Sequence, residues 1–546
     1  MKKITLIIAL FAALVNVGCY EDKSTLADNP IDGVELTIAE EDKTIRVGYK
    51  EQIDVVPNLT KGGSTDLTGL EYEWAINLFT GWGNSEYEVV GNEKELHTVL
   101  NNPASGEYYY LRLIVTDTLN DNLQYSFLYK VYVQNSMTDG LLICDTKDDV
   151  TSDLHLIMND KFTQFYDKQE KIFRNILSDK GETYPALIKS LAPASAGYYP
   201  GLNLMWAVDE NGQIGGYNTE DYTLSDMKKC FIYAPESINA VMRIGQYICA
   251  DTDLGFFAVN YVSFEASYFG WINSTMSGYP IDNGVYAAYS GNGIGSDNSA
   301  YSLGAWFCDE ADAFVSADML FYPAPQATLY PNGNHDLSNK RAIAGGMSVD
   351  EITPSFLLKD EQTGEYTIYV LSRQMDEQGE YDADWNWIVT APAVPSSIKA
   401  AYTVPAEGKA LLDKAVAVDF ACLESIIYVA TEDGVYTINF AGVSPIVNTV
   451  AQFKTSGETI TGMQLYQQGM YLTERNQIYN PEYPDQGGWE QVDWNNRAII
   501  VTAQKGDEGV VYVVPMIQFG TGNLDASSAV RYDGFGRILA VSTTVY

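Results

Sequence analysis

The chain has 546 residues, with 72 acidic side chains against 33 basic ones and a formal net charge of -39. Phosphates of nucleic acids and anionic lipid headgroups repel so acidic a chain, which argues against both as partners. At 46% hydrophobic and 19% charged residues, the composition is that of a folded protein and excludes a disordered acidic tail. The length exceeds what one hydrophobic core organises and predicts two domains, or one large β architecture with an appendage.

Residues 1–18 have the pattern of a signal peptide. Lys2 and Lys3 precede an apolar run from Ile4 to Val15 that is too short to span a bilayer. The run leads into Val15-Asn16-Val17-Gly18-Cys19, which resembles a bacterial lipobox, although Asn16 stands where that motif has a leucine-like residue. The resemblance implies that Cys19 is lipidated and becomes the new N-terminus. Ordinary cleavage that leaves Cys19 as a passenger is the alternative.

Residues 19–30 are polar and predict a lipid anchor followed by a tether. Tyr20, Glu21 and Asp22 resemble the acidic export signal of surface lipoproteins in glycan-foraging Gram-negative bacteria. This resemblance implies a protein that is anchored by lipid to the outer membrane and faces the cell exterior. Its contact with the membrane would then be the lipid anchor alone.

Residues 31–135 predict an immunoglobulin-like β-sandwich, because short runs that alternate apolar and polar residues suit sheets with one face on a core. The predicted strands are 34–38, 44–47, 52–56, 71–76, 108–115 and 125–133. The residues Tyr72-x-Trp74 and Tyr109-x-Leu111-x-Leu113-x-Val115 resemble strands of PKD domains. In that family the tryptophan is a core residue, and the domain is a spacer or interaction module without a catalytic site of its own.

Residues 138–546 predict a β-propeller of about seven blades. Turns of acidic or amide residues with glycine recur before aromatic or β-branched runs, as in Asp209-Glu-Asn-Gly212 and Glu432-Asp-Gly434, which is typical of consecutive antiparallel hairpins. A long hairpin array that must hide its sheet edges closes into a propeller. The terminal run 536–541 is expected to pair with the opening run 140–143 and to seal the ring. A stacked sandwich or a β-helix is the alternative.

Taken together, the lipobox, the PKD-like region, Gly140-Leu-Leu-Ile143 and Tyr532-Asp-Gly-Phe-Gly-Arg-Ile-Leu539 resemble the PKD-like family lipoproteins of glycan-foraging bacteria. The resemblance implies an accessory surface subunit in nutrient capture. It also implies two partners, a TonB-dependent transporter and the lipoprotein lid of that transporter. No catalytic residue is carried over, because the family pattern offers none.

The sequence carries no motif of a catalytic, cofactor or metal site, so none of the three is predicted. H-E-x-x-H, G-x-S-x-G and Walker sequences are absent, and three histidines do not suffice for a multi-histidine metal site. The acidic segments 148–153, 309–312 and 376–382 lack the ligand alternation of an EF-hand and are interpreted as solvated turns. Cys144, Cys230, Cys249, Cys308 and Cys422 are interpreted as small buried hydrophobic residues.

Aromatic residues in polar loops are the candidate ligand-binding residues. Exposed indoles stack on the C–H faces of sugar rings and also anchor peptides. The candidates are Tyr483, Trp489 and Trp494 in one loop and Trp385 and Trp387 in another, where 384–387 places two indoles on one side of a short strand. Packing between propeller blades is the structural alternative for each of them.

Three hypotheses of function remain open at this point. The first, which we favour, is a non-catalytic lipoprotein that binds an oligosaccharide or peptide on the propeller and works with the transporter. The second is a propeller glycosidase or lyase that uses two carboxylates in the central channel. The third is a scaffold that contacts only the transporter subunits.

Overall fold

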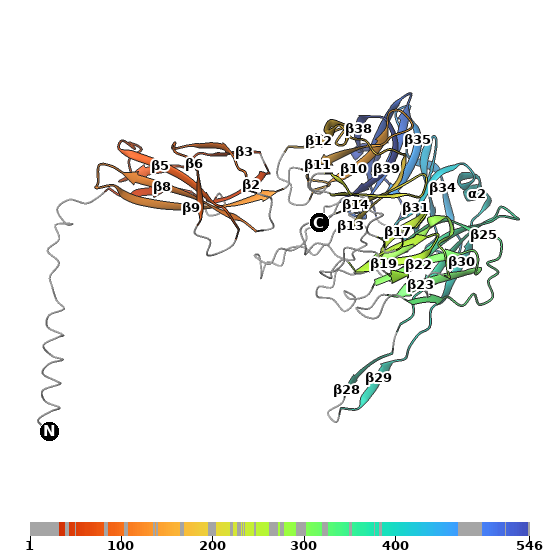
Figure 1. Ribbon diagram of the computed structural model, residues 1–546. Coiled ribbons are helices and arrows are strands. Elements are labelled where there is room, and N and C mark those ends of the chain that lie inside the picture. The colour runs from red at the N-terminus through yellow and green to blue at the C-terminus, as the bar shows by residue number, and fades with distance from the viewer. Residues whose placement is uncertain are drawn as a thin grey trace, which may run out of the picture. The chain divides into compact units, whose positions relative to one another are not determined.

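The computed structural model divides the chain into two compact units, Met1–Ser136 and Met137–Tyr546 (Figure 1). Among the described residues, no helix has the length and apolar character needed to cross a membrane. The residues that the structure describes are 32–38, 43–49, 51–80, 86–102, 107–134, 137, 140–163, 169–194, 204–218, 222–225, 231, 233, 235–244, 247–260, 271–272, 278–290, 302–318, 326–348, 352–375, 377–381, 385–467, 494–518 and 520–543.

The N-terminal unit is a β-sandwich. Its larger sheet has five strands in the order β2-β9-β8-β5-β6, in which β2 runs parallel to β9 and the other neighbours are antiparallel. Two short pairs, β1 with β4 and β3 with β7, pack on the same core. The strands are β1 (Val34–Leu36), β2 (Thr44–Gly48), β3 (Gln52–Val55), β4 (Leu59–Lys61), β5 (Leu70–Asn77), β6 (Tyr87–Gly91), β7 (Leu96–Val99), β8 (Tyr109–Asp117) and β9 (Leu123–Gln134).

The core of this unit lies on one face of the five-stranded sheet. Along β8 every second residue is buried, from Tyr109 to Asp117, as the alternating sequence predicts. Trp74 is 0% exposed, its ring lies 5.7 Å from that of Tyr129, and its Nε1 donates a hydrogen bond to the Glu93 carbonyl at 2.9 Å. The expectation that Trp74 is a core residue is therefore confirmed. The strands β4, β6 and β7 were not predicted, because they are short and lie among polar residues.

The second unit is a seven-bladed β-propeller. Its described residues form seven antiparallel sheets of four strands each and one separate two-stranded hairpin. The innermost strand of each blade contacts the innermost strand of the next blade. These innermost strands follow one another around a ring in the order β39, β13, β17, β21, β25, β31 and β35. The ring closes between the last blade and the first, where Gln464 Nε2 of β35 donates to the Val541 carbonyl of β39 at 3.0 Å. The predicted propeller is confirmed, and the sandwich and β-helix alternatives are excluded.

The blades are numbered along the chain, and each is given from its inner to its outer strand. Blades 1 to 3 comprise β39 (Arg537–Thr543), β10 (Leu141–Thr146), β11 (Asp153–Met158) and β12 (Lys171–Phe173); β13 (Ile188–Ala194), β14 (Leu204–Asp209), β15 (Ile214–Asn218) and β16 (Leu224–Ser225); and β17 (Ile238–Ile244), β18 (Tyr247–Thr252), β19 (Gly255–Asn260) and β20 (Trp271–Ile272). Blades 4 and 5 comprise β21 (Tyr286–Ser290), β22 (Ser302–Cys308), β23 (Ala313–Asp318) and β24 (Gln326–Leu329); and β25 (Lys340–Ser348), β26 (Thr353–Asp360), β27 (Tyr366–Ser372) and β30 (Ser397–Thr403). Blades 6 and 7 comprise β31 (Ala415–Phe420), β32 (Ile426–Thr431), β33 (Gly434–Asn439) and β34 (Ile446–Phe453); and β35 (Thr459–Leu465), β36 (Ala498–Lys505), β37 (Glu508–Pro515) and β38 (Val530–Phe535).

The recurring turn motif lies between the second and third strands of a blade. The motif at 209–212 connects β14 with β15, and the motif at 432–434 connects β32 with β33. Gly212 and Gly255 have φ angles of 70° and 108°, which an L side chain adopts only with strain. The motif at 282–284 is an exception, because it forms a short 3-10 turn before β21 and so leads from one blade to the next.

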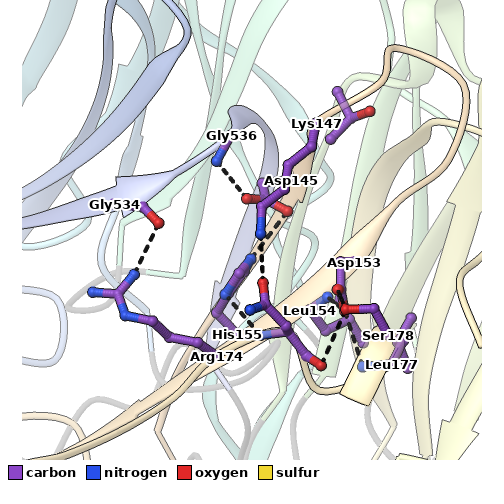
Figure 2. A network of polar contacts seen from close by, with 12 residues as sticks. Asp145, Lys147, Asp153, Leu154, His155, Arg174, Leu177, Ser178, Gly534 and Gly536 are labelled. Carbon is purple, nitrogen blue, oxygen red and sulfur yellow. Dashed lines mark hydrogen bonds and ion pairs between the residues drawn. The ribbon is translucent and has the colours of Figure 1, made fainter. Parts of the chain in front are cut away.

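Strand β39 seals the ring by pairing with β10, as the sequence predicts. The two strands are antiparallel, with Ile143 opposite Val541. A buried polar network reinforces this pairing (Figure 2). Asp145 Oδ2 accepts a hydrogen bond from the Gly536 amide at 2.5 Å, and Asp145 Oδ1 lies 3.0 Å from His155 Nε2.

The His155 ring is positioned from both sides. The Asn175 amide donates to its Nδ1 at 3.2 Å, so the ring proton lies on Nε2 and faces Asp145. Burial alone would raise the pKa of Asp145, but the contacts with His155 and the Gly536 amide outweigh it and hold this pKa below its usual value. Asp145 and His155 are both 0% exposed, so the pair is part of the fold.

The four described cysteines of the propeller, Cys144, Cys249, Cys308 and Cys422, are buried and form no disulfide within the described part of the chain. Burial raises the pKa of the Cys249 thiol to about 12, which makes it unreactive. The interpretation of these four as small buried hydrophobic residues is confirmed, and Cys230 lies outside the described residues. One short helix, α2 (Ala406–Leu412), connects blades 5 and 6.

Candidate functional site

A hairpin inserted into blade 5 carries two of the predicted ligand-binding tryptophans. Strands β28 (Gln378–Tyr381) and β29 (Trp387–Ala391) pair with each other and, among the described residues, with no other strand. They lie between β27 and β30 in the sequence, although β27 and β30 pair directly in the blade. In Figure 1 the hairpin extends away from the blades. At its base, the backbone amides of Met375 and Val394 donate to each other's carbonyls, both at 2.8 Å.

Both faces of this hairpin are open to solvent. Ile388 and Val389 are consecutive in β29, so their side chains point to opposite faces, yet they are 48% and 47% exposed. Neither face is therefore covered by the blades. A lone two-stranded hairpin is marginally stable in water, and exposed apolar residues on both of its faces make it a candidate site of interaction.

Three rings meet near the end of the hairpin, and we call Tyr381, Trp385 and Trp387 the aromatic cluster. The centroid of the Tyr381 ring lies 5.9 Å from that of Trp385 and 5.1 Å from that of Trp387. The three side chains are 61%, 81% and 46% exposed, in that order along the chain. Trp387 Nε1 donates to Glu377 Oε1 at 3.1 Å, which orients the indole. The three rings are thus held together while their surfaces stay open to solvent.

The backbone at Trp385 is in the left-handed region, with φ of 62°. This conformation is uncommon for a bulky residue and costs of the order of 1–3 kcal/mol. Trp385 therefore lies before β29 and not within it, which corrects the expectation that both indoles share one side of a short strand. The Tyr381 ring brings the two indoles into one cluster instead.

Trp494 lies elsewhere, at the junction of blades 7 and 1. It is partly buried, its ring lies 6.0 Å from that of Phe162, and Lys161 Nζ lies 5.1 Å from its ring centroid. This environment matches the alternative of packing between blades. Tyr483, Trp489 and the anchor residue Cys19 lie outside the described residues. The predicted ligand-binding residues consequently fall in two separate places, and the structure does not join them into one site.

Tyr381 was not predicted from the sequence. It is the direct cross-strand partner of Trp387, so the register of the hairpin is what identifies it. Its position four residues before Trp385 in an acidic segment is the signal that the sequence did contain.

The inner strands offer one carboxylate within their described residues, Asp419 of β31. Asp419 Oδ2 accepts a hydrogen bond from the Leu465 amide of β35 at 2.7 Å, and Oδ1 accepts one from the Phe420 amide at 2.8 Å. Burial outweighs these hydrogen bonds and raises the pKa of Asp419 to about 6. The side chain thus connects the inner strands of blades 6 and 7.

We expect Asp419→Asn to stabilise the protein at neutral pH. The pKa of Asp419 is 3.8 without the protein environment and about 6 in the folded state, so ionisation opposes folding above pH 6. A difference of about two pKa units corresponds to about 2–3 kcal/mol. The gain in stability should become smaller as the pH falls from 6 to 4, because Asp419 of the folded wild type then becomes protonated and uncharged. Denaturant unfolding of wild type and variant between pH 4 and pH 8 measures the difference in their free energies of unfolding.

Asp413 provides the control for this experiment. Its contact with Lys409 holds the pKa of Asp413 below its usual value, so Asp413→Asn should lower the stability at neutral pH. Destabilisation by Asp419→Asn at pH 7 would mean that the two backbone hydrogen bonds outweigh the burial of the charge.

The acidic segments 148–153 and 309–312, interpreted as solvated turns, are turns in the structure, whereas the described part of the third, 377–381, consists mostly of strand β28, so the interpretation was wrong for that segment. Asp148, between β10 and β11, accepts hydrogen bonds from the Val150 and Thr151 amides at 2.9 and 2.8 Å, which lower its pKa to about 2. Asp309, between β22 and β23, pairs with Arg341 at 2.6 Å. Within the part of the chain that the structure describes, no group of three or more His, Cys, Asp or Glu side chains is arranged to hold a metal ion.

Comparison with known proteins finds one family match. Residues 19–183 match the PKD-like family, so the match covers the N-terminal unit and continues through β12 of blade 1. No curated protein matches the chain.

Solved structures that resemble the chain do so at low identity. A quinoprotein alcohol dehydrogenase-like protein from Bacteroides thetaiotaomicron is 12% identical with a TM-score of 0.30, and the similarity covers 93% of this chain and 96% of that one. AztD from Citrobacter koseri is 8% identical with a TM-score of 0.31, covering 87% and 98%. The WD40 domain of Pan2 from Neurospora crassa is 10% identical with a TM-score of 0.23, covering 61% and 97%. The chain is therefore similar to the PKD-like family over residues 19–183 and to propeller-like structures over most of its length.

Proposed function

We propose that this protein is a non-catalytic binding protein that captures a ligand with the aromatic cluster of the blade 5 hairpin. In this proposal, lipid on Cys19 anchors the protein to the outer membrane, facing the cell exterior. The protein then acts as an accessory subunit for a TonB-dependent transporter and the lipoprotein lid of that transporter. The anchor and these partners are inferred from the resemblance of residues 15–22 and of the whole chain to surface lipoproteins.

The observation that carries the proposal is the exposure of Tyr381, Trp385 and Trp387 in one cluster. Large aromatic side chains are normally buried, and here the strained Trp385 is 81% exposed. Indole faces stack on the C–H faces of sugar rings and on apolar peptide side chains. Glu377 and Glu380 lie beside the cluster in sequence and supply acceptors for hydroxyl or amide groups.

An oligosaccharide is the ligand class that we favour over a peptide. The described part of the hairpin presents rings and carboxylates, which together match the alternation of C–H faces and hydroxyl groups on a sugar. A peptide would additionally pair with the open edges of β28 and β29, and backbone hydrogen bonds would then contribute to its affinity.

We expect Trp385→Ala and Trp387→Ala each to weaken ligand binding at least tenfold, and the double variant to abolish measurable binding. Truncation of a buried aromatic contact typically costs about 2 kcal/mol or more, and 1.4 kcal/mol corresponds to a factor of ten. Isothermal titration of the full chain without its signal peptide, against a panel of neutral oligosaccharides and oligopeptides, measures the effect. The circular dichroism spectrum should not change, because both side chains lie outside the propeller core.

Phe79→Ala is the matched control, since Phe79 is 61% exposed but lies in the N-terminal unit. Unchanged affinity in the double variant would overturn the proposed site. Release of product from a polysaccharide, abolished by Asp419→Asn, would instead favour the propeller enzyme. Co-purification with the transporter without affinity for any member of the panel would favour a scaffold.

A further inference from the structure

We propose that the N-terminal unit carries a second binding surface, which takes an acidic polysaccharide on the outer face of its five-stranded sheet. The surface consists of three cation–ring pairs, which we call the stacked pairs: Arg46 with Tyr132, Lys130 with Tyr108, and Arg112 with Tyr87. This surface lies in a different unit from the aromatic cluster, so the inference goes beyond the proposed function.

The register of the sheet places these side chains on the outer face. Tyr109, Leu111 and Val131 are 2%, 0% and 0% exposed and point into the core. Their neighbours along the strands therefore point outward, since successive side chains in a strand alternate between faces. Arg46 is directly opposite Tyr132, across the parallel pair β2 and β9. The stacked pairs thus extend across β2, β9, β8 and β6.

Each cation lies over an aromatic ring. The Arg112 guanidinium carbon is 4.3 Å from the Tyr87 ring centroid, the Arg46 carbon is 4.8 Å from that of Tyr132, and Lys130 Nζ is 4.8 Å from that of Tyr108. The rings of Tyr108 and Tyr132 are themselves in contact, 5.6 Å apart. Such stacking holds the charged groups in place, so less side-chain entropy is lost when an anion binds.

The three cations have no carboxylate partner in the part of the chain that the structure describes. Other cations of the chain, such as Lys61, Lys340 and Arg341, pair with carboxylates. The Nε of Arg112 is also buried without a hydrogen-bond partner. The stacked pairs therefore present free positive charge for an external anion.

An acidic polysaccharide fits this surface better than other polyanions. A flat sheet face suits an extended polymer, whereas small ligands are held in concave pockets. The carboxylate or sulfate groups of such a polymer would meet the cations, and its sugar rings would lie on the tyrosines and on Leu128, which is 48% exposed opposite Arg112. Duplex DNA carries one charge per about 1.7 Å and would be repelled by the remainder of a chain with net charge -39.

Two carboxylates on the same face of the sheet limit how far the proposed binding surface extends. Glu71 and Glu73 lie on β5 opposite Thr116 and Ile114, further along β8 from the stacked pairs. Their carboxylates repel an anionic polymer, so the polymer is expected to lie over β2, β9 and the first half of β8.

Affinity gel electrophoresis of the full chain without its signal peptide tests this inference. The gels contain polygalacturonate, chondroitin sulfate or neutral dextran. We expect the two acidic polymers, but not dextran, to retard the protein, and retardation to weaken as salt rises. The triple variant Arg46→Gln, Arg112→Gln, Lys130→Gln should lose affinity by about tenfold or more, because each cation that meets an anion releases counterions. Arg112→Lys should retain part of the affinity.

The triple variant Lys94→Gln, Lys180→Gln, Lys189→Gln changes the net charge equally but leaves the stacked pairs intact, and it should bind like wild type. Equal losses in both triple variants, equal retardation by dextran, or no retardation by either acidic polymer would each overturn the proposal. Stronger binding to phosphatidylglycerol vesicles or duplex DNA than to the polysaccharides would overturn it in favour of a general polyanion surface. Because Trp385→Ala and Trp387→Ala should leave this retardation unchanged, the two proposals can fail separately.

Discussion

Replacing Asp145 with alanine is expected to lower the free energy of unfolding of the propeller by about 2–6 kcal/mol. The substitution leaves the buried Gly536 amide without an acceptor and removes the carboxylate that lies 3.0 Å from buried His155 Nε2, and each buried polar group that loses its partner costs about 1–3 kcal/mol. The lost contacts stabilise the pairing of β10 with β39, which closes the ring. Denaturant unfolding followed by tryptophan fluorescence measures it.

The pH dependence distinguishes this explanation from a simple loss of packing. The pKa of Asp145 lies below its usual value in the folded protein, so its contribution is present above the unfolded pKa of 3.8. The difference between wild type and Asp145→Ala should therefore diminish as the pH falls through that value. Asp145→Asn should cost less than Asp145→Ala, since the amide oxygen still accepts from Gly536.

Asp160→Ala is the control for Asp145, because the Asp160 side chain is 70% exposed and, among the described residues, its one ion pair is with the neighbouring Lys161. Its effect should remain within about 0.5 kcal/mol. An Asp145→Ala variant as stable as Asp160→Ala would show that the buried network does not hold the ring closed.

Trp74→Ala is expected to destabilise the N-terminal unit alone, by about 3–5 kcal/mol. The substitution removes the largest fully buried side chain of that core and its hydrogen bond to Glu93. For a unit of this size, a loss of 3 kcal/mol lowers the melting temperature by about 12 °C or more. Differential scanning calorimetry of the full chain should show one transition that moves and a propeller transition that does not.

Phe79→Ala in the same unit should leave both transitions in place, because Phe79 is 61% exposed. Trp74→Ala would contradict the division into two units if it shifted both transitions together. That result would mean that the two units unfold as one.

The strand patterns and turns predicted the fold because each blade is a local structure. Alternating residues and Gly-containing turns define a hairpin from residues that are close in the sequence, so the hairpins of blades 2, 3, 5, 6 and 7 could be recognised from the sequence. The turn at 309–312 of blade 4 was not recognised as a hairpin, since it contains no glycine and uses Asp312 with φ of 45° instead. The closing pair β10 and β39 was predicted from two apolar runs, because a ring leaves few other partners for them.

The candidate site was predicted in part. Trp385 and Trp387 stood out because they are aromatic residues in a polar loop, and the structure leaves both of them exposed. Trp494 stood out for the same reason but packs near Phe162, which comes from blade 1. Whether a tryptophan is exposed or packs against a distant segment depends on how the blades are arranged. The sequence therefore did not distinguish Trp385 and Trp387 from Trp494. The stacked pairs were not found because their members are separated by up to 86 residues.

The sequence by itself determined the all-β class, the propeller and the size of the acidic excess, since composition and hairpin signals are local properties. Only the tertiary structure decided which of the acidic turns share one face of the propeller. Successive antiparallel strands place every turn between the second and third strands of a blade on the same face of the propeller. Those turns contain one basic residue, Lys147, against many acidic ones: Asp148, Asp149, Glu210, Asp253, Asp309, Glu310, Asp312, Glu361, Glu365, Glu432, Asp433 and Asp507. Twelve acidic side chains that are far apart in the sequence are thus brought to one face by these turns, because the ring repeats the same strand direction seven times.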